Sequence, residues 1–172
     1  MEFSSETRLS EHFRLRELEK SQVALRNDID NTVQDETIFN NLKSLCEEIL
    51  EPIRNNFGKP FSPNSGYRCL ELNRKLGSRD TSQHTLGQAV DIELPGIDNE
   101  ELLYYIKEKL DYDQIILEYY DGIDPHSGWV HVSYVSPEEN RKNSFSYDGK
   151  TYRVIEWQNL LLYNLDLGSI EK

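Results

Sequence analysis

Apolar residues recur at helical spacing in the longest amphipathic segment of the chain. Its apolar stripe consists of Ile38, Leu42, Leu45, Cys46, Ile49 and Ile53. The pattern predicts a long helix that begins near Asp35, where Asp35 or Thr37 caps the first turn, and that ends at Gly58 and Pro60. Pro52 falls inside this helix and predicts a kink, because proline has no backbone N–H. The stripe indicates that the helix packs on a core.

Strands are predicted in the second half of the chain. Gln88 to Leu94 and Gly128 to Val135 alternate between apolar and polar residues, the period of a strand, and Asp113 to Tyr120 is a third strand. The other predicted elements are one or two short helices within Leu9 to Val23, a short strand and turn over Phe61 to Arg68, a brief helix over Leu70 to Leu76, a helix over Asp98 to Leu110, a hairpin over Ser144 to Val154 and a terminal helix over Glu156 to Leu165.

This order of elements predicts an α+β fold with a mostly antiparallel sheet packed against helices. A length of 172 residues suits one domain with a sizeable core. Within the domain, residues 1–34 are expected to form a helical and loop segment, residues 35–135 the central core, and residues 136–172 a C-terminal hairpin and helix.

Charge and hydropathy exclude several classes of partner. The chain has 31 acidic and 19 basic residues, a net charge of −12, and no Lys/Arg cluster typical of a nucleic-acid binder. The negative charge disfavours an anionic membrane surface, and no apolar run approaches the length of a membrane span. The N-terminal residues lack the pattern of a signal peptide, which predicts synthesis in the cytoplasm. We expect a monomer.

Two short segments, Ser82 to Asp91 and Gly128 to Ser133, supply a candidate metal site. Their residues His84, Asp91 and His131 are three ligands of the kind that hold a catalytic zinc ion with one coordination position free. Strand alternation places Asp91, Glu118 and His131 on the sheet face opposite the apolar residues. The alternative is that both histidines are ordinary polar residues.

The motifs S-x-H-x-x-G-x-A-x-D and W-V-H-V-S resemble those of the zinc D-Ala-D-Ala carboxypeptidase family, which shares its fold with the Hedgehog signalling domain. The resemblance extends to L-S-E-H-F (Leu9 to Phe13), S-G-Y-R (Ser65 to Arg68) and Y-D-Q-I-I-L-E (Tyr112 to Glu118), and so covers roughly Leu9 to Val135. It implies a zinc peptidase domain in which His84, Asp91 and His131 bind Zn²⁺.

The resemblance also implies catalytic residues. Arg68 matches an arginine that holds a substrate carbonyl or carboxylate, and Glu118 matches the carboxylate that moves a proton between water and the leaving amine. His126 lies near the position of a catalytic histidine in some members, so it is a candidate second donor or oxyanion stabiliser. The alternatives are a structural ion pair for Arg68, a solvated strand end for Glu118 and an exposed loop position for His126. Trp129 either lines a substrate groove or packs beside the site.

The function implied is hydrolysis of a peptide bond in bacterial peptidoglycan, of the D-Ala-D-Ala type, as a carboxypeptidase or endopeptidase. One alternative is an L-Ala-D-Glu endopeptidase. Another is a non-catalytic, zinc-containing module that binds a partner or forms part of a virion. Because no signal peptide is evident, a phage lysis enzyme that reaches the cell wall through a holin, or as a virion component, would suit this sequence. The alternative is a cytoplasmic bacterial enzyme.

Overall fold

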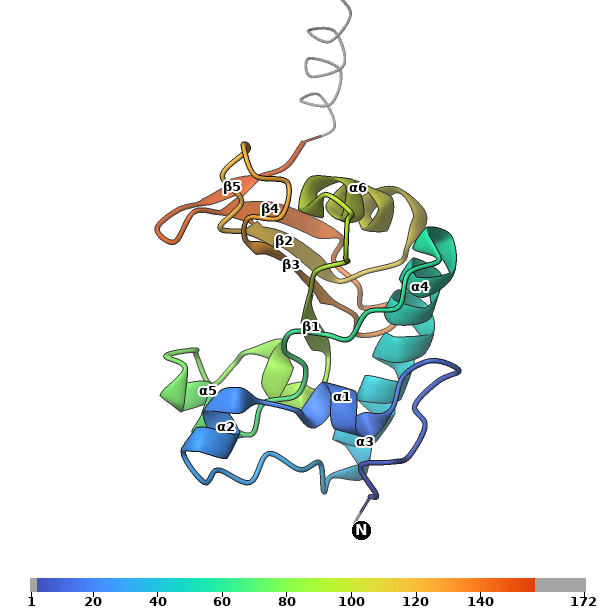
Figure 1. Cartoon of the computed structure of the whole chain (residues 1–172), viewed down its shortest axis with the longest axis vertical. Helices are drawn as coiled ribbons and strands as arrows, with labels where there is room; N and C mark the ends of the chain where they lie inside the picture. The colour runs from blue at the N-terminus through green and yellow to red at the C-terminus, as the bar shows by residue number, and fades with distance from the viewer. Residues whose placement is uncertain (1–2, 157–172) are drawn as a thin grey trace, which may run out of the picture.

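The computed structural model describes residues 3–156 of the chain. Figure 1 shows most of the helices at one end of the molecule and a five-stranded sheet with a covering helix at the other. The helices are α1 (Leu15–Glu19), α2 (Gln22–Arg26), α3 (Glu36–Leu45), α4 (Glu51–Phe57), α5 (Leu70–Lys75) and α6 (Asn99–Lys109). The strands are β1 (Ala89–Ile92), β2 (Gln114–Glu118), β3 (Trp129–Ser133), β4 (Asn143–Tyr147) and β5 (Tyr152–Val154). No helix among the described residues is long and apolar enough to cross a membrane.

The predicted long helix is confirmed as an unbroken helical segment from Glu36 to Phe57, in which a π-helical turn, η1 (Cys46–Leu50), joins α3 to α4. Asp35 caps it, because its carboxylate accepts hydrogen bonds from the N–H groups of Thr37 and Ile38. Gly58 ends it in the left-handed conformation, at φ +62°. The π-helical turn ends at Leu50, two residues before Pro52, so the helical register changes close to the residue that lacks an N–H donor.

The sheet has the strand order β1-β3-β2-β4-β5. Three of its pairings are antiparallel, and the pairing of β2 with β4 is parallel. The predicted α+β class, the mostly antiparallel sheet, the three strands and the hairpin are therefore confirmed. The brief helix α5 and the helix α6, which is capped by Asp98, also lie where they were predicted.

The predicted strand over Phe61 to Arg68 is wrong. This segment forms only an isolated bridge between Ser65 and Asp91. Pro60 and Pro63 explain this, because neither has the N–H that a regular ladder requires. The terminal helix predicted over Glu156 to Leu165 lies outside the described residues except for Glu156.

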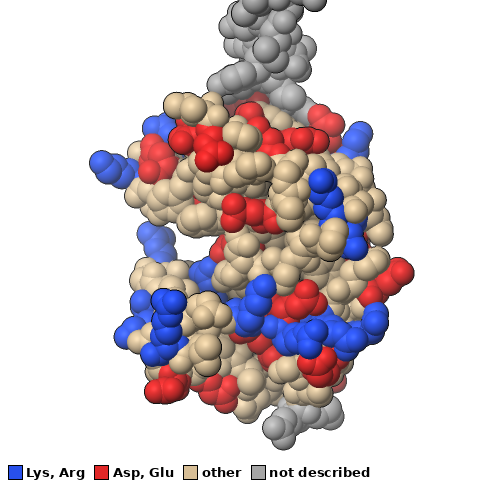
Figure 2. Space-filling view, in the orientation of Figure 1, with Lys and Arg blue, Asp and Glu red and all other residues tan. Residues whose placement is uncertain are grey.

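The two faces of the sheet have different roles. The face covered by α6 is the core, and its side chains are at most 6% exposed: Val90, Ile92, Ile115, Leu117, Val130 and Val132. The opposite face carries the polar residues that alternate with them. A cleft separates the end of the sheet with the β4–β5 hairpin from the half that contains α2 and α5, as the space-filling view shows (Figure 2).

Candidate active site

His84 lies on a 3₁₀ turn, η2 (Gln83–Leu86), that leads into β1. Gly87 ends this turn at φ +68°, and a Cβ there would lie 2.8 Å from the carbonyl oxygen of Ile38. The His84 ring is buried, and its Nδ1 atom lies 2.7 Å from the carbonyl oxygen of Gly66. A carbonyl oxygen can only accept, so Nδ1 carries the hydrogen, and Nε2 keeps a lone pair for a metal.

Asp91 and His131 lie directly opposite each other, because β1 and β3 pair in that register. Asp91 Oδ1 is 3.0 Å from His131 Nδ1 and 3.3 Å from His84 Nε2. All three residues offer ligand atoms within 4.8 Å of one another. Ligands about 2.1 Å from a tetrahedral zinc ion lie roughly 3.4 Å apart, so this donor set fits zinc in both chemistry and spacing.

The protonation states of the site also suit a metal. Burial alone would raise the pKa of Asp91, but the two histidines outweigh it and hold that pKa well below its usual range. Burial lowers the pKa of His84, against the opposing pull of Asp91. At neutral pH the site therefore offers a charged carboxylate and a neutral imidazole, the forms that bind zinc.

Arg68 contacts the other oxygen of the same carboxylate. Its Nη2 atom lies 2.5 Å from Asp91 Oδ2, and its Nε–H donates to Ser65 Oγ at 2.9 Å. The Arg68 side chain is only 13% exposed. The structure thus places Arg68 beside the candidate metal ligand Asp91. The two residues form the structural ion pair that the sequence analysis gave as the alternative to a substrate-binding role.

Glu118 ends β2 on the same sheet face as His131, since it pairs with Trp129, two residues before His131. Its carboxylate makes no recorded hydrogen bond or ion pair with residues 3–156. Burial raises the pKa of Glu118, and the negative charge of Asp91 adds to the rise. An unpaired, partly desolvated carboxylate beside a metal site has the properties of a general base.

His126 does not join the cluster of His84, Asp91 and His131. It lies exposed in the loop between β2 and β3, where its backbone N–H donates to Asp124 at 2.9 Å. It does not belong to the metal-ligating cluster found among the described residues.

An aromatic group around Glu118 was missed at the level of sequence. Trp129 and Tyr147 flank Glu118 on the neighbouring strands, and Tyr119 contacts both of their rings. No local pattern in the sequence pairs Tyr119 with Tyr147. Only the strand register shows the group.

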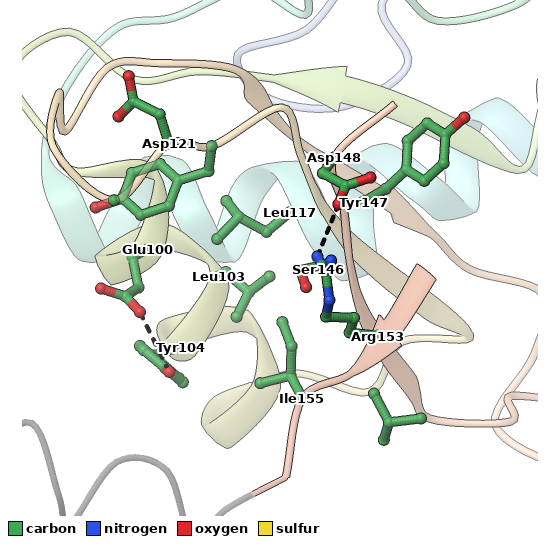
Figure 3. Close-up of a pocket in the computed structure, with 13 residues that line it drawn as sticks. Glu100, Leu103, Tyr104, Leu117, Asp121, Ser146, Tyr147, Asp148, Arg153 and Ile155 are labelled. Atoms are coloured by element: carbon green, nitrogen blue, oxygen red, sulfur yellow. Dashed lines mark hydrogen bonds and ion pairs between the residues drawn. The ribbon is translucent and has the colours of Figure 1, made fainter. Parts of the chain in front are cut away.

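A well-formed cavity lies away from this site. It measures about 400 Å³ and lies between α6, β2 and the β4–β5 hairpin, on the core side of the sheet. Figure 3 shows Leu103, Leu117 and Ile155 lining it, whereas Tyr147 points away. None of the predicted site residues lines this cavity. The candidate metal ligands and Glu118 lie on the opposite face of the sheet.

One comparison with known proteins gives a match. The sequence model of the family described as Peptidase M15 matches residues 11–133. That range contains all of the candidate residues: Arg68, His84, Asp91, Glu118, His126 and His131. No curated protein sequence matches the chain.

Proposed function

Because the chain belongs to the peptidase M15 family, we propose that it is a zinc metallopeptidase that hydrolyses a peptide bond in bacterial peptidoglycan. One observation carries the proposal. Three metal-ligand atoms meet within 4.8 Å, and an unpaired carboxylate stands on the same face of the sheet. That combination is the requirement for metal-assisted hydrolysis.

The proposed metal ligands are His84 Nε2, Asp91 and His131 Nδ1. Zinc bound there would supply Lewis acidity, which acidifies a water molecule and polarises the scissile carbonyl. Glu118 takes the proton of the attacking water and returns it to the leaving amine. Its raised pKa suits both steps, because a base that must also act as an acid works best near the ambient pH.

Arg68 has two roles in this proposal. It holds Asp91 in place through Oδ2, which leaves Oδ1 for the metal. Its positive charge, next to the carboxylate, also favours the negative charge that develops on the substrate oxygen during attack. His126, exposed in its loop, has no step in this mechanism.

We propose D-Ala-D-Ala as the type of bond that is cut, with L-Ala-D-Glu as the competing assignment. Digestion of purified peptidoglycan by the zinc-loaded protein, followed by mass spectrometry of the products, distinguishes them. Loss of a terminal D-Ala, or separation of a D-Ala cross-link, supports the first assignment. Stem peptides that begin with D-Glu support the second.

The controls for this digestion are a chelator and the Glu118→Gln variant. Both should stop the release of new amino groups, although the variant should still bind zinc. If the zinc-loaded protein releases nothing from intact wall or from defined muropeptides, the peptidase proposal is wrong. The non-catalytic binding module would then be the better account.

A further inference from the structure

A row of side chains crosses the sheet at the level of Glu118. Trp129 on β3 pairs with Glu118 on β2, which pairs with Tyr147 on β4, which pairs with Tyr152 on β5. Cross-strand partners project from the same face of a sheet. The row therefore lies on the face of the metal site, one level along the strands from the row that contains Asp91 and His131.

The rings of this row touch one another. The Tyr147 and Tyr152 rings are stacked, with centroids 4.3 Å apart. The Tyr119 ring lies 5.0 Å from Trp129 and 5.7 Å from Tyr147. Tyr119 adopts φ +56°, which is costly for a residue with a side chain. This left-handed turn allows its ring to bridge Trp129 and Tyr147 on either side of Glu118.

The outer part of the row is open to solvent. Tyr119 is 47% exposed and Tyr152 is 57% exposed. Burial raises the pKa of Tyr152, and the negative charge of Glu118 adds to the rise. The loop between α5 and η2 lies across the cleft seen in Figure 2 from the β4–β5 hairpin. Connected, exposed aromatic faces on a cleft wall are typical of a ligand-binding surface.

The length of the row indicates the size of its ligand. Glu118 and Tyr152 are two strand spacings apart, or about 10 Å. An extended peptide covers that distance with about three residues. A substrate cut beside Glu118 would therefore present, at Tyr152, a group about three residues away from the cut bond.

We propose that the aromatic platform, formed by Trp129, Tyr119, Tyr147 and Tyr152, binds a pyranose ring of the glycan that carries the stem peptide. This inference rests on the proposed function. A pyranose ring offers a flat face of C–H groups that stacks on an aromatic ring, and its hydroxyl and acetamido groups suit the tyrosine hydroxyls. The alanine and acidic residues of a stem peptide offer no such flat apolar surface.

The direct test is binding of the peptide-free disaccharide GlcNAc-MurNAc to the full chain, measured by calorimetry. The wild type should bind it, and Tyr152→Ala should weaken binding by roughly fivefold or more, the scale of one lost stacking contact. Tyr152→Phe should keep most of the affinity, because stacking needs the ring. Leu25→Ala, at a residue 72% exposed on α2, is the matched surface control and should bind as the wild type does.

Thermal melting of each variant checks that it is folded. No binding by the folded wild type, or equal binding by folded Tyr152→Ala, would overturn the platform. A free stem pentapeptide is tested as a competitor of the disaccharide. If the pentapeptide binds this surface more tightly than the disaccharide does, the platform binds peptide, and the proposal is overturned.

Kinetics separate this inference from the proposed function. The ratio of kcat/KM for disaccharide-pentapeptide to that for free pentapeptide should exceed one in the wild type and fall in Tyr152→Ala. If the protein binds the disaccharide but cuts neither substrate, the peptidase proposal fails and the platform stands. If it cuts both equally and does not bind the disaccharide, the peptidase proposal stands and the platform fails.

Discussion

Arg68 Nη2 lies 2.5 Å from Asp91 Oδ2, while the other oxygen of the same carboxylate is the one that both histidines approach. Asp91 therefore divides its two oxygens between a guanidinium and the metal position. Arg68 thus orients the carboxylate and partly balances its negative charge.

Replacing Arg68 should weaken both metal binding and catalysis. We expect Arg68→Ala to lower zinc affinity about tenfold, because a hydrogen-bonded partner that orients a ligand is worth about that much or more. Turnover should fall by roughly 100-fold from the lost oxyanion partner. Arg68→Lys should recover only part of each loss, since lysine keeps the charge without the forked geometry. A competing chromophoric chelator and steady-state kinetics measure the two effects, and unchanged values in Arg68→Ala would contradict this assignment.

Zinc should stabilise the fold through His84, Asp91 and His131. A ligand at 100 times its dissociation constant adds about 2.7 kcal/mol to the free energy of unfolding, so the melting temperature should rise on addition of zinc. His131→Ala should abolish the rise. His12→Ala is the matched control, because His12 pairs with Glu51 at 2.8 Å and is not part of the cluster. A zinc-induced shift that survives His131→Ala would place the metal elsewhere.

The proton-transfer role can be assigned by comparing two substitutions. Glu118→Gln should reduce kcat by a factor of about 100 to 10,000, the usual contribution of a general base, with zinc affinity retained. His126→Ala should change kcat by less than about threefold, because a solvated loop side chain makes no contact with the site. The opposite result, a large loss in His126→Ala and a small one in Glu118→Gln, would transfer the role to His126.

Gly128 should be required for the position of Glu118. At φ +65°, an added Cβ would lie 1.8 Å from the Glu118 carbonyl oxygen, so the ends of β2 and β3 would have to separate. Gly128→Ala should cost more than about 2 kcal/mol of unfolding free energy and lower kcat. Gly122→Ala has a similar φ, +74°, with nothing within 4 Å of the added Cβ, and should cost only about 1 kcal/mol. If urea unfolding shows that Gly128→Ala and Gly122→Ala lower the free energy of unfolding equally, the close contact with the Glu118 carbonyl oxygen is relieved in Gly128→Ala.

The buried carboxylate of Asp113 should make stability depend on acid pH. Burial opposes its ionisation, but hydrogen bonds from Arg141 and Gln83 lower the pKa of Asp113 to about 2. The folded-state pKa is thus below that of the unfolded chain, near 3.9. Ionised Asp113 therefore adds about 2 kcal/mol to the free energy of unfolding. This contribution is fully present above about pH 4 and is lost as the pH falls through about 2.

Arg141→Ala tests this linkage. The difference in unfolding free energy between wild type and Arg141→Ala should be largest above pH 4 and should shrink toward pH 2. Arg26→Ala, at an exposed position on α2, should show a small difference that does not vary with pH. A difference for Arg141→Ala that is constant from pH 2 to 5 would mean that the ion pair does not control the titration of Asp113.

Local patterns were sufficient for most of the elements and for the residue types of the candidate metal cluster. Alternation of apolar and polar residues within β1 and β3 predicted that Asp91 and His131 lie on the polar face of the sheet. The apolar stripe predicted the long helix. These inferences succeed because helix and strand periods are properties of neighbouring residues. The segment with Pro60 and Pro63 shows the limit, since an extended pattern does not reveal where hydrogen-bond partners are missing.

Pairing between distant segments of the chain decided which groups surround the candidate site. Glu118 lies between Trp129 and Tyr147 only because β2 pairs antiparallel with β3 and parallel with β4. That register depends on residues far apart in the chain, and a shift of one residue would turn every side chain to the other face. The ion pair of Arg68, the hydrogen on His84 Nδ1 and the exposure of His126 likewise depend on which segments fold against one another. The proposed zinc ligands can be read from the chain, but their hydrogen-bond partners and the neighbouring aromatic rings are brought to them only by folding.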